Sequence, residues 1–404
     1  MRRYLFQKIY LFAVQESAVT GGVCCFKEKL YLCHLHHFLE SGLKRHNRHI
    51  ILYPFSLIYG LVTALRNFLF DFDVLKSTSF NIPVISVGNL SSGGTGKTPH
   101  TEFILRILQP EWKTAVLSRG YKRKTKGFYL ADAESDNLIL GDEPFQIHQK
   151  FPSVYVAVDE KRVHGVEKLL ELIPDLQAVV LDDAFQHRYI QPGLSILLTD
   201  YSNLYTRDLV LPAGELREWK KGSKRANIIV VTKCPLTINP IDMRLIETEL
   251  NPEANQHLFF SGFDYDELVP VFPESNPEDR TLDRLKETES GVLLMAGIVS
   301  PEPIVEYLRN YTEKTETLFF DDHHAFQSKD FIQMSKKLDK LSAIDKIIVV
   351  TEKDAARLVS NPYFPEALKS RTYALPIRVR ILHNQENIFI QKIKNYVAEN
   401  SRYR

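Results

Sequence analysis

The apolar and polar positions of this chain follow two alternating patterns. Short, unbroken apolar runs indicate buried strands, and longer stretches with apolar residues at helical spacing lie between them. The apolar runs cover residues 84–87, 114–118, 154–158, 178–181, 194–198, 228–232, 292–295, 317–320 and 347–351. Because unbroken apolar strands that alternate with helices are typical of a parallel sheet covered on both faces, the pattern predicts an α/β fold. In such sheets, ligands bind at the carboxyl ends of the strands.

The length of 404 residues is enough for two domains. We predict a first domain over residues 77–269 and a second, smaller α/β domain over residues 284–404. The stretch between them, 270–283, is rich in Pro, Glu and Asp and is typical of a hinge. Residues 1–50 are rich in His and Cys and lack clear periodicity, so we interpret them as an extension, or a wrongly assigned start, that carries no function.

Residues 51–76 contain a helical pattern of a different kind. Apolar residues recur at helical spacing from 57 to 72, and Pro54 suits a first helical turn. Arg66 interrupts the run, which is too short for a secure membrane span. Basic residues stand just before it, as in helices that lie in a membrane surface. A helix packed on the body of the protein is the alternative, and the sequence leaves both open.

The composition of the chain limits the classes of molecule that it is expected to bind. The chain has 51 Lys and Arg against 50 Asp and Glu, a net charge of +1, so nothing in the balance indicates a nucleic-acid binder. Its four cysteines show no metal-ligand spacing, which favours a reduced, cytosolic chain over a disulfide scaffold. We predict no protein partner.

A glycine-rich turn follows the first predicted strand and ends in Gly-Lys-Thr. Such a turn binds nucleotide phosphates through backbone N–H groups, and its Lys and hydroxyl contact the phosphates and Mg²⁺. The residues that we expect to bind the nucleotide are Ser91, Ser92, Gly93, Gly94, Thr95, Gly96, Lys97 and Thr98. Ser91 stands where the common pattern has its first glycine, and we expect Gly93 and Gly94 to supply the positive φ angles. Residues 232–235 lack the Asp of guanine-reading motifs, which favours ATP over GTP.

Acidic residues follow the strand predicted at 178–181. Asp182 resembles the strand-end carboxylate that holds Mg²⁺ in P-loop enzymes, with Asp183 beside it. A helix cap or turn is the alternative.

A second acid pair, Asp142 and Glu143, lies between Gly141 and Pro144. Transfer of a phosphoryl group to an alcohol benefits from a carboxylate that takes the hydroxyl proton, and either residue could do so. An N-terminal helix cap is the alternative.

Two further segments carry candidate chemistry. Asp322 and His323 follow the strand at 317–320, where a carboxylate can tune an imidazole base, although a metal site or a structural role is also open. The basic run 119–126 could hold a substrate phosphate or be a solvated loop.

Taken together, these segments closely resemble the tetraacyldisaccharide 4'-kinase family of lipid A biosynthesis. The resemblance runs from about residue 51 almost to the C-terminus, and its motifs occupy residues 87–99, 118–121, 141–144, 181–188, 211–218 and 322–326. Ala184, where a glycine is common in the family, is a departure. The resemblance implies a P-loop NTPase-type parallel sheet sandwiched by helices, a second smaller α/β domain and an N-terminal amphipathic helix.

The resemblance also implies a reaction. ATP and Mg²⁺ would phosphorylate the 4'-hydroxyl of a tetraacylated glucosamine disaccharide 1-phosphate, at the cytoplasmic face of the inner membrane of a Gram-negative bacterium. The helix at 51–76 would then be a peripheral anchor.

Carried over residue by residue, the resemblance gives each motif a role. Lys97 would contact the β- and γ-phosphates, Thr98 and Asp182 would hold Mg²⁺, and Asp142 would be the base, assisted by His323 with Asp322 behind it. The secondary candidates are Glu143, Asp183, Gln186, His187, Glu215, Arg119 and Arg162. A nucleotide-hydrolysing switch or metallochaperone of the SIMIBI type is the competing function, although Ser92 stands where such switches often carry a Lys.

Overall fold

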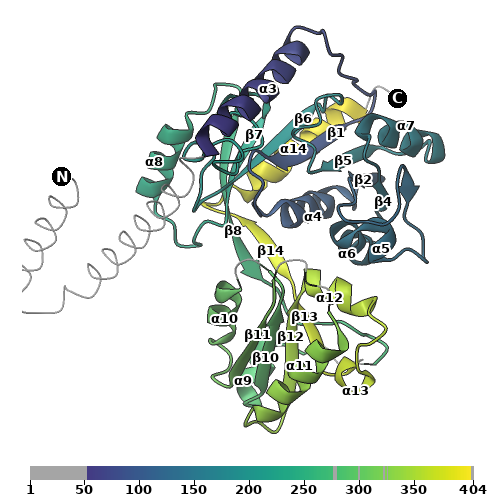
Figure 1. The fold of residues 1–404 in the computed structure, drawn as a ribbon, viewed down its shortest axis with the longest axis vertical. Coiled ribbons are helices and arrows are strands. Elements are labelled where there is room, and N and C mark those ends of the chain that lie inside the picture. The colour runs from purple at the N-terminus through teal and green to yellow at the C-terminus, as the bar shows by residue number, and fades with distance from the viewer. Residues whose placement is uncertain (1–51, 276–279, 299–300, 322–323, 325, 402–404) are drawn as a thin grey trace, which may run out of the picture.

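The computed structural model describes residues 52–275, 280–298, 301–321, 324 and 326–401 (Figure 1). It contains a nine-stranded and a five-stranded sheet, each with helices on both faces. The predicted fold class, an α/β protein with a parallel-rich sheet sandwiched by helices and a second smaller α/β domain, is confirmed.

The nine-stranded sheet forms the first domain. Its seven inner strands run parallel, and the edge strands β3 and β14 run antiparallel to their neighbours. In sheet order the strands are β14 (Ile377–Ile381), β8 (His257–Tyr265), β7 (Ile228–Thr232), β6 (Leu194–Asp200), β1 (Val84–Asn89), β5 (Ala178–Asp182), β2 (Thr114–Ser118), β4 (Tyr155–Val158) and β3 (Tyr129–Leu130).

Helices cover both faces of this sheet because its apolar strands present side chains to each side. Ile85 and Val87 of β1 pack with α4, α6 and α14, whereas Val84 packs with α7 on the opposite face. The helices of this domain are α3 (Tyr53–Asp71), α4 (Lys97–Leu108), α5 (Asn137–Leu140), α6 (Asp142–Lys150), α7 (Arg162–Leu172), the 3₁₀ helix η2 (Lys220–Arg225), α8 (Pro240–Leu250) and α14 (Glu386–Ser401).

The five-stranded sheet forms the second domain, which lies below the first in Figure 1. Its strands in order are β11 (Thr315–Phe319), β10 (Gly291–Ala296), β12 (Lys346–Thr351), β13 (Thr372–Leu375) and β9 (Val269–Pro270), of which only β9 is antiparallel. Its helices are α9 (Leu282–Glu287), α10 (Glu302–Leu308), α11 (Ser328–Lys340), α12 (Glu352–Val359) and α13 (Glu366–Lys369).

The chain crosses between the domains twice, which corrects two predicted boundaries. After β13 the chain returns to the first domain, where β14 pairs with β8 and α14 buries Phe389, Ile393 and Val397 in the first core. The second domain therefore does not extend to residue 404. The predicted hinge is also wrong, since β9 already pairs with β13 and Arg280 bridges to Leu268 within the second domain. Prediction failed here because β14 is short and alternates in burial, so it lacks an unbroken apolar run.

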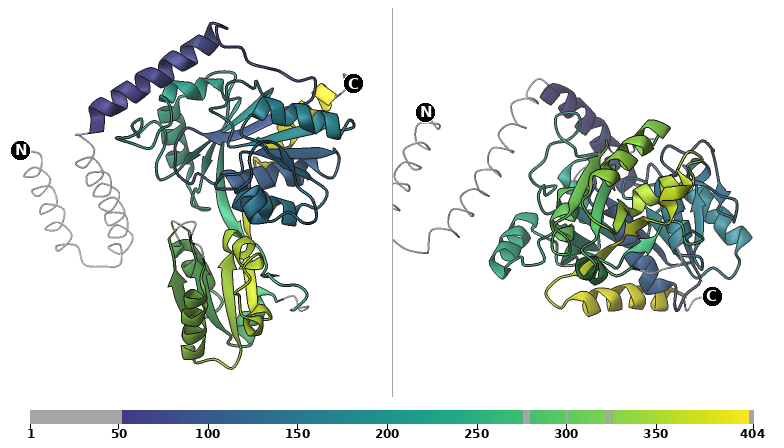
Figure 2. Two further views of the ribbon diagram at one scale, coloured as in Figure 1. Left: turned by 45° about the vertical axis from the view of Figure 1, so that its right-hand side comes forward. Right: turned by 90° about the horizontal axis from the view of Figure 1, so that it is seen from below.

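Helix α3 lies along the outer surface of the first domain, on the side away from the second domain (Figure 2). Ser56, Gly60 and Phe70 are buried against the domain. Its other side is apolar and exposed: the side chains with more than half of their surface accessible are Phe55, Ile58, Leu61, Val62, Leu65, Phe68 and Phe72. None of the helices in the described part of the chain is long and apolar enough to cross a membrane.

Candidate active site

The glycine-rich turn joins the end of β1 to the start of α4. Gly96 caps α4 with φ 81°, and a Cβ atom there would lie 2.7 Å from Cζ of Phe263. Only glycine fits this left-handed, closely packed position. The expectation that Gly93 and Gly94 supply the positive φ angles is wrong, because neither has one. The turn thereby directs Lys97 and Thr98, the first residues of α4, to the carboxyl edge of the sheet.

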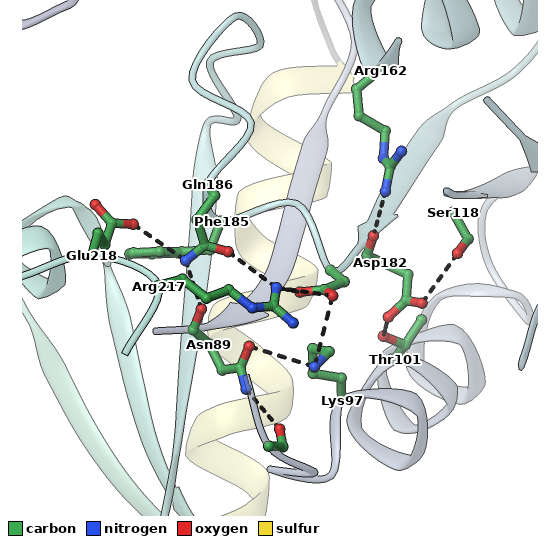
Figure 3. A network of polar contacts seen from close by, with 12 residues as sticks. Asn89, Lys97, Thr101, Ser118, Arg162, Asp182, Phe185, Gln186, Arg217 and Glu218 are labelled. Atoms are coloured by element: carbon green, nitrogen blue, oxygen red, sulfur yellow. Dashed lines mark hydrogen bonds and ion pairs between the residues drawn. The ribbon is translucent and has the colours of Figure 1, made fainter. Parts of the chain in front are cut away.

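Lys97 lies between two oxygen-bearing side chains (Figure 3). Its Nζ is 3.4 Å from Oδ1 of Asn89 and 3.8 Å from Oδ2 of Asp183. Asn89 also donates to the carbonyl of Gly93 at 3.2 Å, so one amide contacts both the loop and its lysine. Asn89 was not among the predicted site residues, because an Asn that ends a buried strand gives no specific signal in the sequence.

Asp182 ends β5 and is buried. Its carboxylate accepts hydrogen bonds from Thr101 of α4 at 3.1 Å and Ser118 of β2 at 3.4 Å. Burial and the neighbouring charge of Asp183 raise the pKa of Asp182, and Lys97 opposes this shift. A buried carboxylate with a raised pKa is a strong position for a cation.

Asp183 adopts a positive φ of 46°, and its carboxylate contacts both Lys97 and Arg217. Nη1 of Arg217 lies 2.9 and 3.1 Å from the two carboxylate oxygens. Burial raises the pKa of Asp183, but the charges of Lys97 and Arg217 outweigh it and hold the pKa below its ordinary value. The pKa values of Asp182 and Asp183 are thus shifted in opposite directions, which favours the protonated form of Asp182 and the ionised form of Asp183.

Arg162 contacts the backbone of the acid pair at Asp182. Its guanidinium is buried and donates to the backbone carbonyls of Asp159 at 2.6 Å and Asp182 at 3.1 Å. Burial lowers the pKa of Arg162 to about 10, although Asp182 and Asp183 oppose the shift.

The second acid pair opens α6. Gly141 precedes it with φ 92°, and a Cβ there would lie 2.9 Å from the carbonyl oxygen of Tyr121, so the glycine lets α6 begin against the basic loop. Asp142 and Glu143 occupy the first helical turn, where the helix dipole favours negative charge.

The pKa of Glu143 depends on the charges near the nucleotide loop. Burial and the charge of Asp182 raise its pKa, whereas Lys353 and Lys97 lower it. The charges of Asp182 and Lys97 therefore act on Glu143, although the two acid pairs are widely separated in the sequence.

Asp142 has a partner that the sequence did not suggest. Nε and Nη2 of Arg357, on α12 of the second domain, both lie 2.9 Å from Oδ2 of Asp142. Asn137 approaches the other carboxylate oxygen at 3.5 Å.

The remaining candidates surround the loop. Gln186 donates to the carbonyl of Asn89 at 2.8 Å, and the backbone carbonyl of Glu215 accepts from Ser92 at 2.7 Å. Burial and then the charges of Arg162 and Arg119 lower the pKa of His187 to about 4, so its ring is neutral at pH 7. Arg119 is exposed just after β2.

The predicted Asp322 and His323 lie outside the described residues. The neighbouring His324 is described: its Nε2 is 2.9 Å from Oδ2 of Asp330, and its ring stacks on Phe320.

Helix α3 contacts the segment that carries Arg217. Tyr59 donates to the backbone carbonyl of Arg217 at 3.1 Å, and Trp219 donates to that of Gly60 at 2.8 Å. Arg66 donates to the carbonyl of Gln186 at 2.8 Å. One side of the helix is therefore packed on the body, as one of the two sequence alternatives predicted.

A profile described as Tetraacyldisaccharide-1-P 4'-kinase matches residues 48–398 of the chain. The chain belongs to the tetraacyldisaccharide 4'-kinase family. It is 52% identical over 359 residues to the tetraacyldisaccharide 4'-kinase of Bacteroides thetaiotaomicron, which covers 88% of this chain and 94% of that relative. It is 46% identical over 350 residues to the enzyme of Flavobacterium johnsoniae, covering 87% and 97%. The structure of LpxK from Aquifex aeolicus in complex with ATP is 28% identical with a TM-score of 0.67, covering 86% and 99%.

Membership in the tetraacyldisaccharide 4'-kinase family confirms the predicted resemblance, function and enzyme class. The chain is a lipid A pathway kinase that acts on the 4'-position of a tetraacyldisaccharide. The competing nucleotide switch or metallochaperone finds no support in these relatives.

Proposed function

We propose that the chain transfers the γ-phosphoryl group of ATP to the 4'-hydroxyl of a tetraacylated glucosamine disaccharide 1-phosphate, using the two acid pairs and the glycine-rich loop. The observation that carries the assignment of roles is the meeting of the loop with the strand-end acids: Nζ of Lys97 lies 3.8 Å from Asp183, and Thr101 of α4 donates to Asp182 at 3.1 Å. Glu143 of α6 is near enough for the charges of Asp182 and Lys97 to act on its pKa. This arrangement supports an acceptor-activating carboxylate beside a nucleotide-binding loop.

The loop binds the phosphates of ATP. The N–H groups of Ser92 and Thr95 already donate to the carbonyls of Glu215 and Gly93, so those of Gly93, Gly94, Gly96 and the first turn of α4 remain to bind the phosphate oxygens. Lys97 supplies a cation to the β- and γ-phosphates. Asn89 and Asp183 hold the lysine ready for this contact.

Thr98 and Asp182 would hold Mg²⁺. Within the described ranges no cluster of three or more His, Cys, Asp or Glu side chains could hold a metal ion. This fits Mg²⁺, which takes one or two protein ligands and completes its shell with water and phosphate oxygens. The buried carboxylate of Asp182, whose pKa burial raises, is the observation that fits a cation. When bound, Mg²⁺ neutralises charge on the phosphates.

Asp142 accepts the proton of the acceptor hydroxyl. The oxygen of the 4'-hydroxyl attacks the γ-phosphorus, the bond from that phosphorus to the bridging oxygen breaks, and ADP leaves with the electron pair. The proton passes to the carboxylate of Asp142 in the first turn of α6. Assistance by His323 and Asp322 remains a prediction.

The secondary residues have supporting roles in this proposal. Arg119, exposed after β2, is suited to a phosphate of the substrate, whereas Arg162 is suited to holding Asp182 in place. Glu143, Asp183 and Glu215 shape the charge around the loop.

The apolar side of α3 binds a membrane surface, on the cytoplasmic face of the inner membrane. Apolar side chains at helical spacing cover the side of α3 that faces away from the protein, and an exposed apolar surface of this kind favours insertion into the lipid headgroup region. The acceptor carries four acyl chains in this proposal, so the enzyme must work where they are embedded.

The reaction is tested with radiolabelled ATP. The purified full chain, Mg²⁺ and the tetraacylated disaccharide 1-phosphate in detergent micelles should give a labelled lipid that carries phosphate at the 4'-position. Omitting the lipid should leave only slow ATP hydrolysis. A labelled product at another position, or ATP turnover that ignores the lipid, would refute the proposal.

Membrane binding is tested by flotation with vesicles. The variant carrying Leu61→Glu and Leu65→Glu should stay unbound, because both charges fall on the exposed side of α3. A variant with Ile241→Glu and Leu245→Glu is the matched control, since these exposed apolar residues lie on α8. Equal flotation of the two variants would show that α3 is not the anchor.

A further inference from the structure

Arg357 reaches from the second domain into the candidate active site. It lies on α12, its side chain is only 7% exposed, and it forms the two 2.9 Å contacts with Oδ2 of Asp142 on α6. Two N–H groups directed at one carboxylate oxygen restrict where that oxygen can move. A pair this sheltered is little affected by salt.

The other end of the guanidinium is fixed as well. Nη1 of Arg357 lies 3.2 Å from Oδ1 of Asp354, which is fully buried. Asp354 accepts further hydrogen bonds from the hydroxyl of Thr351 at 2.6 Å and the backbone N–H of Gly297 at 2.9 Å. The arginine is therefore a rigid bridge with its base in the second domain.

A second contact between the domains sets the position of α12. Lys150 of α6 binds both Glu352 of α12 and Glu102 of α4, the latter at 2.6 Å. Glu352 also accepts the backbone N–H of Ile377 at 3.1 Å, where the chain returns to the first domain. Because Lys150 ties the first residue of α12, Glu352, to α4 and α6, Arg357 meets Asp142 in a fixed geometry.

We propose that Arg357 is a positioning residue for Asp142, so that the second domain completes the acceptor-activating half of the site. The inference rests on the proposed role of Asp142 as the base. Arg357 does not touch the reacting atoms; it holds the carboxylate in the direction from which it meets the acceptor hydroxyl. Arg357 contacts the carboxylates of Asp142 and Asp354, whereas Lys97 contacts the nucleotide in this proposal.

The test is a double-mutant cycle on lipid phosphorylation. Arg357→Ala should lower kcat about tenfold to hundredfold and leave KM for ATP within about twofold, less than the roughly 10²–10⁴-fold that a general base supplies. In the Asp142→Asn background the same substitution should have almost no further effect, because its action passes through Asp142. Arg357→Lys should recover part of kcat, since an ammonium can keep one contact but not the fork.

Two controls separate positioning from general damage. Arg280→Ala removes another sheltered ion pair of the second domain, with Asp345, and should leave kcat within about twofold of the wild-type value. Thermal melting of every variant shows which of them remain folded, and Arg357→Lys serves if the alanine variant unfolds.

The outcomes distinguish the two proposals. If Asp142→Asn keeps full activity, the proposed base role fails. If Asp142→Asn is inactive but Arg357→Ala keeps wild-type kcat, or loses the same factor with and without Asp142, the positioning role fails alone.

Discussion

The two halves of the candidate active site are built in different ways. The nucleotide half comes from one sheet edge, where the loop after β1 meets the ends of β5 and β2. The acceptor half joins α6 of the first domain to α12 of the second through Asp142 and Arg357. The first half depends on local sequence and strand order, whereas the second depends on how two domains dock. Substitutions should therefore separate ATP binding from transfer to the lipid.

Lys97→Ala should have the largest effect on the nucleotide half. Removing the cation leaves the phosphates without their charged partner, so we expect a loss of about 10²–10³-fold in kcat together with weaker ATP binding. Steady-state kinetics and calorimetric titration with a non-hydrolysable ATP analogue measure the two effects. Unchanged ATP affinity would place the lysine outside the nucleotide site.

Arg217→Ala should have a smaller effect on the same half. Asp183 then loses its ion pair with Arg217 and keeps Lys97 at 3.8 Å, so the lysine is drawn toward Asp183 and away from the phosphates. The loss of one charge-assisted contact predicts a roughly tenfold lower kcat/KM for ATP. Lys168→Ala, which removes an exposed ion pair with Glu171 within α7, is the control and should retain normal kinetics.

The variant with Leu61→Glu and Leu65→Glu should affect only the acceptor. With the apolar side of α3 disrupted, we expect KM for the lipid in mixed micelles to rise severalfold. KM for ATP should stay constant, because the segment that carries Arg217 is contacted by Tyr59 and Gly60 of α3 and Leu61 and Leu65 are exposed. A parallel rise in both constants would mean that the substitutions disturb Arg217 through the packed side of α3.

Asp182→Asn should show how much folding stability the buried carboxylate at the proposed magnesium position costs. Burial raises the pKa of Asp182, so its protonated form favours the folded state and the ionised form weakens it. Without Mg²⁺, stability should therefore fall as pH rises from the ordinary carboxyl range through the raised pKa, and the variant should lack this decline. At pH 7 we expect the metal-free variant to melt higher, by about 2–4 °C for each kcal/mol recovered.

Added Mg²⁺ with an ATP analogue should reverse the order of the two melting temperatures, since only the wild-type carboxylate binds the ion well. Equal melting curves in all conditions would contradict this account of Asp182.

The sequence predicted the strand, turn and helix of the nucleotide half because this information is local. An apolar strand, a glycine-rich turn and Lys97 stand within a few positions of each other, and Asp182 directly follows its own strand. The positive φ fell on Gly96 instead of Gly93 and Gly94 because α4 starts against Phe263 of β8, a contact that no local pattern reveals.

The acceptor half could be predicted only in part, because its partners are distant in the chain. Asp142 was found from its loop, but Arg357 is one of many charged residues on amphipathic helices and lies 215 positions away. The return of β14 and α14 to the first domain was missed for a related reason. The sequence of α14 indicates which face of the helix is apolar, but it does not indicate which domain packs against that face.

The central claim is that Asp142 serves transfer and not nucleotide binding. The most direct test measures ATP-analogue affinity and lipid phosphorylation on the same preparation of the Asp142→Asn variant. We predict wild-type affinity for the nucleotide with phosphoryl transfer reduced about 10²–10⁴-fold. Transfer at the wild-type rate, or a loss of transfer explained by an equal loss of nucleotide affinity, would contradict the division of the site into two halves.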